Sequence, residues 1–167
     1  NHLTFEMKPV KKLLSKLLPL NDKIILDPFA NRRHKFATIT NDIDTNKATD
    51  FNLCALEFLN KFESNSVDVV LFDPPYSLRQ LKEVYSNIGQ SLTSTHTTTY
   101  FSSIKNEISR IIKPGGFCFS FGWSSVGLGK SRNFTKLNIT LINHGGYHND
   151  TIIVTEIKNK NLSEWFK

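Results

Sequence analysis

Apolar and polar positions along this chain switch between helical and strand periods. Apolar residues at positions 10, 13, 14, 17 and 18 share one helical face, and Pro9 suits the first turn of that helix. The same spacing predicts three further helices, over residues 55–62, 78–88 and 104–112. Apolar runs predict buried strands over residues 23–26, 37–40, 67–72 and 117–121, with a very short one at 51–53.

Turn and capping residues set the expected boundaries of these elements. Ser77 is the expected N-cap of the second of the three further helices, and Gly89 is its expected stop. Residues 91–103 are rich in Ser and Thr, which predicts an exposed loop. Pro114-Gly115-Gly116 is expected to end the last helix.

The end of the chain predicts a hairpin. Apolar and polar residues alternate over 137–141 and again within 151–157, on either side of His144-Gly145-Gly146. Strands that alternate with helices and finish in a hairpin imply an α/β fold. We expect an open, mostly parallel sheet with helices on both faces and a C-terminal antiparallel hairpin. The 167 residues fit one domain over residues 1–167, because no repeat or linker interrupts them.

Composition narrows the setting of the protein. A net charge of +6 and a pI near 9.3 favour an anionic partner, although charge alone also fits proteins that bind no nucleic acid. Cys54 and Cys118 lack metal-ligand spacing, which favours a reducing, cytoplasmic setting. No stretch predicts a transmembrane helix or a signal peptide, so no membrane association is expected. The chain begins with Asn rather than Met, which is consistent with trimming there.

The most informative motif is Asp73-Pro74-Pro75-Tyr76, called the tetrad below, which follows the apolar strand over residues 67–72. The amino group of an aromatic base is a weak nucleophile because its lone pair is delocalised into the ring. The Asp73 carboxylate and the Pro74 carbonyl can each accept one of its N–H bonds, which exposes the lone pair. Tyr76 can stack on the base, and two prolines fix the loop without adding a competing N–H. The alternative is a chance turn, which the preceding strand disfavours.

Two further acids also follow predicted strands. Ligands of open parallel sheets bind at the carboxyl ends of the strands, where Asp27, Asp42 and Asp73 are all expected. Asp27 opens a turn suited to the amino-acid end of a cofactor, whose ammonium group it could hold directly or through water. Asp42 could accept hydrogen bonds from both hydroxyls of a ribose. Each of these two acids alone would be read as an ordinary turn former, and the downstream tetrad favours the binding role.

Together these motifs resemble the class I S-adenosylmethionine (SAM)-dependent methyltransferases of the DNA adenine-N6 type. Within that type the chain is most similar to small adenine-specific methylases of phages and prophages. The resemblance covers residues 4–158 and includes the tetrad. It also rests on residues 4–9, 27–31, 41–42, 113–116, 120–123, 144–146 and 148–151.

The resemblance implies a Rossmann-like fold, SAM as the cofactor and the four tetrad residues as the catalytic set. An Asp in the first tetrad position points to adenine, because cytosine-N4 enzymes usually carry Ser there and protein-glutamine enzymes Asn. Some guanine-N2 enzymes of ribosomal RNA also carry Asp, so an RNA substrate stays open. The implied cofactor-binding residues are Phe5, Lys8, Asp27, Pro28, Phe29, Ala30, Asn31, Asp42, Ile43, Cys54, Ala55 and Asp73.

Two departures from the family pattern concern cofactor binding. Arg32 and Arg33 stand where small residues are common, so they either crowd the cofactor or point to solvent. Relatives often carry an acid at the position of Cys54 that binds the adenine amino group of SAM. Because Cys is a poor acceptor, a backbone group would have to substitute, and we expect weak SAM binding.

Charged and metal-ligand side chains outside these motifs give weaker signals. Four cations are candidates for phosphate contacts, with a solvated surface as the equally favoured alternative. His144, His148 and Asp150 could be offered as metal ligands, but methyl transfer needs no metal and none is expected. The candidate cations are Arg79, Lys82, Lys130 and Arg132.

The sequence therefore predicts methyl transfer from SAM to adenine N6 in DNA. A base inside a duplex must be flipped out to reach the tetrad. No separate target-recognition domain is predicted, so specificity would come from residues 76–103 or from a partner chain, either a second copy or another subunit. We expect short or relaxed sequence specificity. The alternatives are a weak or inactive methyltransferase-fold subunit that binds nucleic acid in a larger complex, and an RNA amino-methyltransferase.

Overall fold

The computed structural model describes residues 4–18, 22–87, 89, 94–146 and 149–160. Within these ranges the core of the protein is a six-stranded sheet of order β2-β1-β3-β4-β6-β5. β1 to β4 run parallel, and β6 is antiparallel to both β4 and β5. This arrangement confirms the predicted α/β class and the C-terminal hairpin. The strands are β1 (Ile25–Asp27), β2 (Ile39–Thr40), β3 (Val67–Phe72), β4 (Ile112–Gly122), β5 (Phe134–Ile142) and β6 (Thr151–Lys158).

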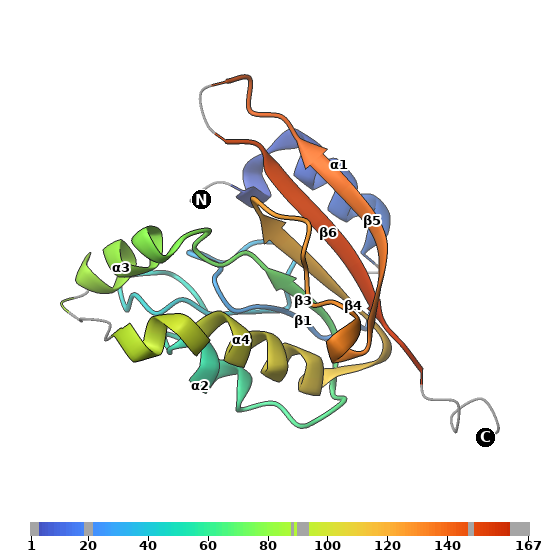
Figure 1. The fold of residues 1–167 in the computed structure, drawn as a ribbon, viewed down its shortest axis with the longest axis horizontal. Coiled ribbons are helices and arrows are strands. Elements are labelled where there is room, and N and C mark those ends of the chain that lie inside the picture. Colours follow the sequence, from blue (N-terminus) through green and yellow to red (C-terminus); the bar gives the residue numbers. More distant parts are fainter. Residues whose placement is uncertain (1–3, 19–21, 88, 90–93, 147–148, 161–167) are drawn as a thin grey trace.

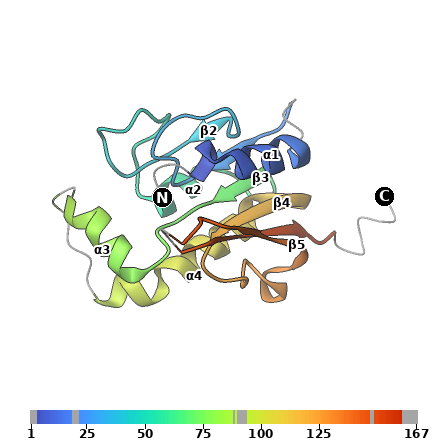
Figure 2. The ribbon, with the colours of Figure 1, turned by 90° about the horizontal axis from the view of Figure 1, so that it is seen from above.

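Helices cover both faces of this sheet, as predicted. Figure 2 shows α1 on one side of the sheet and α4 on the other, and Figure 1 shows α3 projecting away from the sheet beyond β3. No helix in the described ranges is long and apolar enough to cross a membrane. The helices are η1 (Thr4–Glu6), α1 (Lys8–Leu17), α2 (Ala55–Leu59), α3 (Leu78–Asn87), α4 (Ser94–Ile111) and η2 (Lys130–Arg132).

Two apolar layers hold the helices to the sheet. On one face the buried stripe of α1, Val10 and Leu14, packs with Val69 and Phe119 of the sheet. On the other face Phe58 of α2 and Ile108 of α4 belong to a cluster that includes residues of β3 and β4. Fully burying one such side chain contributes roughly 1.5–3 kcal/mol. The layers leave the carboxyl ends of the parallel strands for the loops that carry the predicted motifs.

The predicted loop over residues 91–103 is wrong from Ser94 onward, because α4 already begins there. Tyr100 and Phe101 pack against the core cluster of that face, about one helical turn before Ile104. Burial of these aromatic rings outweighs the weak helix propensity of the Ser and Thr residues around them. Residues 91–93 lie outside the described ranges.

Strand β4 begins earlier than predicted, at Ile112, and includes the Pro114-Gly115-Gly116 segment. The pairing with β3 jumps from Val67↔Ile112 to Val69↔Phe117, so this segment forms a bulge. Gly116 lies so close to β3 that a Cβ there would sit 2.7 Å from the Asp68 carbonyl oxygen. The turn signal therefore marks a bulge within a strand rather than a loop before one.

Other predicted boundaries agree with the structure or shift slightly. The Gln80 N–H donates to Ser77 Oγ at 3.2 Å, which confirms the N-cap of α3, and Gly89 takes the left-handed φ of +72° expected of a stop. The predicted short strand at 51–53 is reduced to one parallel bridge, Asn41↔Phe51. Helix α2 ends at Leu59, before the predicted residue 62.

Candidate active site

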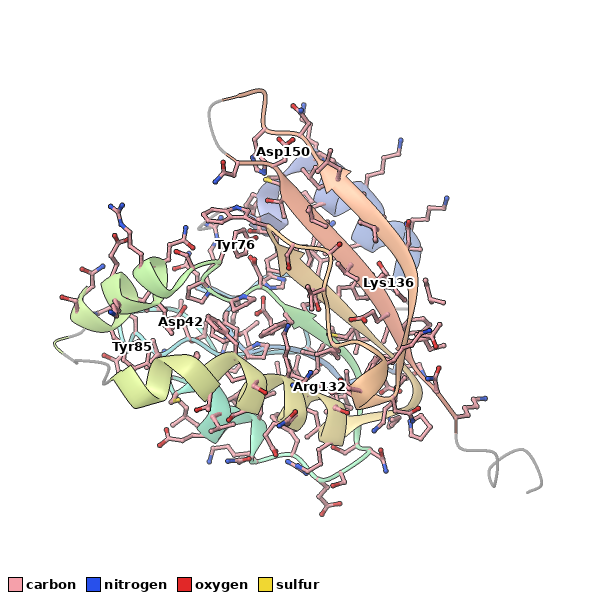
Figure 3. The ribbon with its side chains drawn as sticks, in the orientation of Figure 1. Asp42, Tyr76, Tyr85, Arg132, Lys136 and Asp150 are labelled. Atoms are coloured by element: carbon pink, nitrogen blue, oxygen red, sulfur yellow. The ribbon has the colours of Figure 1, made fainter. Side chains whose placement is uncertain are left out.

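A cavity of about 420 Å³ opens at the carboxyl ends of β1, β2 and β3. Its walls come from the loops after these three strands, from the start of α2, and from α3 and α4. Figure 3 shows Asp42, Tyr76 and Tyr85 toward the end of the molecule at which α3 projects. The cavity thus brings together residues from three separate predicted motifs. Those that line it are Pro28, Phe29, Asn31, Asp42, Ile43, Ala55, Asp73 and Pro75.

Asp73 is the tetrad residue whose carboxylate chemistry matters most. It follows β3 directly, lines the cavity and is only 7% exposed. Burial raises the pKa of its carboxyl to about 6, which a hydrogen bond from Tyr76 partly opposes. Most Asp73 side chains are therefore ionised at neutral pH, and a carboxylate only accepts hydrogen bonds.

Tyr76 does not line the cavity. Its hydroxyl donates to Asp73 Oδ1 at 2.6 Å, and its backbone N–H donates to Gln80 Oε1 at 2.7 Å. Hydrogen bonds also join its hydroxyl to the side chains of Thr4 and Thr151, while burial raises its pKa. The tyrosine thereby links the tetrad to η1 and to the start of β6.

Asp27 is fully buried at the end of β1 and does not line the cavity. One carboxylate oxygen accepts the Phe29 N–H at 2.9 Å, and the other lies 2.8 Å from Nε2 of the buried His34. Burial raises the pKa of Asp27 and the His34 contact opposes that rise. The carboxylate therefore shapes the loop after β1 in this structure, and its contact with a cofactor ammonium, directly or through water, stays a prediction.

The predicted N-terminal cofactor residues also lie outside the cavity wall. Phe5 stacks on His34 with ring centroids 4.3 Å apart, and meets Phe121 edge to face at 5.3 Å. Lys8 is exposed at the first position of α1. Phe5 therefore covers the buried His34 rather than facing the cavity.

Asp42 occupies the position predicted for ribose binding, in the cavity wall after β2. Its Oδ2 accepts the Asn31 N–H at 3.1 Å and its Oδ1 accepts the Asp44 N–H at 2.8 Å. Burial raises the pKa of its carboxyl, and these two N–H groups oppose that rise. Each oxygen keeps a second lone pair, so the carboxylate can still accept two ligand hydroxyls.

The loop after β1 accommodates its missing glycines. Asn31 takes the left-handed φ of +55°, a conformation that Asn tolerates better than most residues. The guanidinium of Arg32 lies 3.4 Å from Glu6, and that of Arg33 lies 2.7 Å from Asp50. Both arginines are exposed and neither lines the cavity, so they do not crowd it.

Cys54 lies just before α2 and does not itself line the cavity, whereas its neighbour Ala55 does. Its Sγ is 3.8 Å from the hydroxyl of Tyr85, which is hydrogen-bonded in turn to Tyr100. Both tyrosines line the cavity; burial raises the pKa of Tyr85 to about 12 and also raises that of Tyr100. Two phenols thus stand near the position at which the resemblance led us to expect an acid.

The candidate phosphate-binding residues lie in two places. Arg79 and Lys82 are exposed on α3, next to the tetrad, and Arg79 pairs with Glu83 at 2.9 Å. Lys130 is exposed in η2. Arg132 is committed to its own chain, donating to Asn106 Oδ1, the Leu128 carbonyl and Ser102 Oγ at 2.8–3.2 Å. Figure 3 shows Arg132 well away from Tyr76.

His144, near the hairpin turn, makes its hydrogen bonds within that turn. The His144 backbone N–H donates to Asp150 Oδ1 at 2.9 Å, and its Nε2 lies 3.0 Å from Thr151 Oγ1. His148 lies outside the described residues. Within the described ranges no three His, Cys, Asp or Glu side chains gather as a metal site would require.

Several residues of this site were not singled out from the sequence. His34, Gln80 and Tyr100 carry no motif, and Tyr85 was read only as part of the apolar face of a helix. The spacing of Gln80 four residues after Tyr76 was the one available signal, since α3 begins between them. The His34–Asp27 contact depends on the path of the loop, which periodicity does not predict.

No family model and no curated protein matches the sequence. Several solved structures are similar in fold. A Burkholderia thailandensis 1,6-didemethyltoxoflavin-N1-methyltransferase, with S-adenosylhomocysteine (SAH) bound, has a TM-score of 0.62 and 12% identity, over 94% of this chain and 80% of its own. A SAM-dependent methyltransferase of Methanosarcina mazei has a TM-score of 0.57 and 11% identity, over 89% and 98%.

TrmN from Thermus thermophilus is also similar, with a TM-score of 0.57 and 17% identity over 91% of this chain. The chain spans only about half of TrmN, 49% of its length. Identities this low establish the fold and leave the substrate open, and the predicted likeness to phage enzymes stays a prediction. The chain has the Rossmann-like fold of SAM-dependent methyltransferases.

Proposed function

We propose that this protein transfers a methyl group from SAM to the exocyclic N6 of adenine in DNA. One observation carries the proposal: Asp73 of the tetrad and Asp42 line the same cavity at the carboxyl edge of the sheet. The cavity therefore contains one carboxylate that can bind an amino group, Asp73, and one that can bind a ribose, Asp42. That pairing is what a two-substrate reaction between a nucleoside cofactor and an aromatic amine requires.

The cavity fits the cofactor in size and chemistry. Its volume of about 420 Å³ lies within the usual range of small-molecule sites. Asp42 offers acceptor oxygens to ribose hydroxyls, and Phe29 and Ile43 offer apolar wall on either side of it. Tyr85 and Tyr100 add hydroxyl groups at the wall formed by α3 and α4. Bound SAM would supply a methyl group on a sulfonium, which is a good donor without any metal.

The tetrad orients the amino group that receives the methyl group. The Asp73 carboxylate accepts one N–H of the adenine amino group, and the Pro74 carbonyl is the expected acceptor of the other. Both bonds draw the nitrogen toward tetrahedral geometry and free its lone pair, which then bonds to the methyl carbon as the carbon–sulfur electron pair returns to sulfur. Holding the two reactants in line is the main contribution of the protein.

Asp73 can also accept the proton that methyl transfer releases. The methylated nitrogen carries an extra proton and a positive charge, and the adjacent carboxylate can take that proton. A pKa of about 6 suits this role, because the group is mostly ionised at neutral pH and returns the proton to water readily.

DNA as the partner agrees with the charge of +6 and with exposed cations beside the tetrad. Arg79 and Lys82 lie on α3, where a strand that delivers a flipped adenine would pass. Phosphate contacts from these residues would give salt-dependent affinity without sequence information. A partner subunit or second copy would then add specificity.

The test uses purified protein, isotope-labelled SAM and unmethylated DNA, followed by digestion to nucleosides and mass spectrometry. We expect labelled N6-methyladenine, absent with Asp73→Asn, which keeps the size of the side chain and removes its charge. SAH binding by calorimetry controls for an intact cavity in both proteins. A parallel reaction with RNA tests the other substrate: label that appears only in RNA would show that RNA is the substrate. SAH binding without any labelled base would support the inactive-subunit alternative.

A further inference from the structure

Trp123 is a large aromatic residue whose side chain is partly exposed to solvent. It directly follows β4, is 43% exposed, and meets Tyr76 edge to face with ring centroids 5.6 Å apart. An exposed tryptophan beside the candidate catalytic tetrad calls for a reason, since burial of the ring in the core would contribute more to stability. The next two residues, Ser124 and Ser125, are also exposed and would not obstruct an approaching planar ligand.

The position of Asp73 divides the carboxyl edge of the sheet into two halves. The sheet order β2-β1-β3-β4-β6 places β3, which Asp73 directly follows, between the two halves. The cavity is built from the loops after β1, β2 and β3. Tyr76, Trp123 and Thr151 belong to the other half, beside β4 and β6, and none of the three lines the cavity.

Methyl transfer needs its two substrates on opposite sides of the reacting carbon, because the nitrogen must approach in line with the carbon–sulfur bond. With the cofactor in the cavity on the β1–β2 side, the adenine must reach Asp73 from the β4–β6 side. The aromatic pair of Tyr76 and Trp123 stands on that side. The pair is therefore in place to receive a base.

We propose that Trp123 is a stacking platform for the adenine that the tetrad methylates. This inference rests on the proposed function and names a residue of its nucleic-acid site. Stacking on an exposed indole ring would hold the base in plane while its amino group replaces the Tyr76 hydroxyl at Asp73 Oδ1. Because every base has a flat face, such a platform adds affinity without strict sequence choice, in agreement with the relaxed specificity we expect.

Fluorescence of Trp123 tests the contact directly. The chain has two tryptophans, Trp123 and Trp165, so Trp165→Phe leaves Trp123 as the sole reporter. The probe is a short single-stranded oligodeoxyadenylate, with SAH present, and its control is an abasic oligomer of the same length and charge. We expect the oligodeoxyadenylate to quench the indole emission and the abasic oligomer to leave it unchanged. Binding of the oligodeoxyadenylate, followed by dye anisotropy, without any change in emission would overturn the inference.

Substitution of Trp123 provides a second test of the proposal. Trp123→Ala should weaken oligodeoxyadenylate binding by about 5- to 150-fold, the range of base–aromatic stacking, and leave abasic binding unchanged. Trp123→Phe keeps a ring and should restore most of the affinity, and melting temperatures check that each variant is folded. Equal affinity of the Ala variant and the parent would sink the proposal for Trp123 alone, while labelled N6-methyladenine would still support the enzyme. Failure of the parent protein to bind any oligonucleotide would overturn both.

Discussion

The Tyr76 hydroxyl donates a 2.6 Å hydrogen bond to Asp73 Oδ1, inside the motif expected to grip the substrate amine. The bond occupies one lone pair of the oxygen that we propose receives the adenine amino group. It also stabilises the ionised form of Asp73, whose pKa burial raises to about 6. Tyr76 thus keeps the carboxylate charged before a base arrives, and in the complex that we propose the adenine amino group takes its place at Oδ1.

Replacing this tyrosine should change the pH dependence of the reaction. Tyr76→Phe keeps the ring for stacking and removes the donor, so the pKa of Asp73 should rise further. Because activity requires the carboxylate, it is lost as the pH falls through the pKa, and the acidic limb of kcat/KM should move from about pH 6 to higher pH. Initial rates between pH 5 and 9 measure this limb. An unchanged limb with a lower rate would show that the hydroxyl does not control the charge of Asp73.

The same carboxylate should make the protein less stable at neutral pH. Since its pKa is above the unfolded value of 3.8, the folded state holds a proton that the unfolded state releases between about pH 4 and 6. Stability therefore falls as the pH rises through that window. Asp73→Asn removes the buried charge and should raise the free energy of unfolding at pH 7.5 by about 2 kcal/mol, with the gain shrinking toward pH 4. Urea unfolding at both pH values measures it, and a loss at pH 7.5 would contradict it.

Periodicity predicted those parts of the fold in which neighbouring residues alone decide the structure. The strand Val67–Phe72 was predicted with the bounds it has, because six successive buried or half-buried residues leave little ambiguity. The first half of α4 was missed because burial of Tyr100 and Phe101 is a tertiary effect. The bulge at Gly115-Gly116 was read as a loop because the sequence does not reveal how close β3 lies.

The candidate site also has parts that the sequence predicts and parts that depend on tertiary packing. Asp42 and Asp73 meet in one cavity, as expected from strand ends that converge on one edge of a parallel sheet. The partner of Asp27 was not predictable, since His34 reaches it only through the path of a seven-residue loop segment. Tyr85 and Tyr100 come from different helices, and only the packing of α3 and α4 at the cavity joins them.

Restoring an acid at position 54 should strengthen cofactor binding. Cys54→Asp would provide a carboxylate acceptor for the adenine amino group of SAM, beside the wall formed by Ala55. One hydrogen bond to a charged group, less the cost of partial burial, predicts an affinity about 5- to 10-fold tighter for SAH by calorimetry. Asp is also a good N-cap for α2, so Cys54→Ser, which caps without a charge, is the control. An unchanged dissociation constant for Cys54→Asp would indicate that Tyr85 and Tyr100 already meet the amino group.

The buried pair of Asp27 and His34 should stabilise the loop on which the cavity depends. His34→Ala leaves the Asp27 carboxylate buried with the Phe29 N–H as its remaining hydrogen-bond donor among the described residues, and removes the ring on which Phe5 stacks. We expect a loss of about 3 kcal/mol in the free energy of unfolding at pH 7.5. His34→Gln keeps an N–H donor and should recover part of it. Because burial raises the pKa of Asp27, the Ala variant should lose less at low pH, where the carboxyl is protonated. Equal losses for Ala and Gln at both pH values would show that ring packing, rather than the contact between His34 and Asp27, holds this loop.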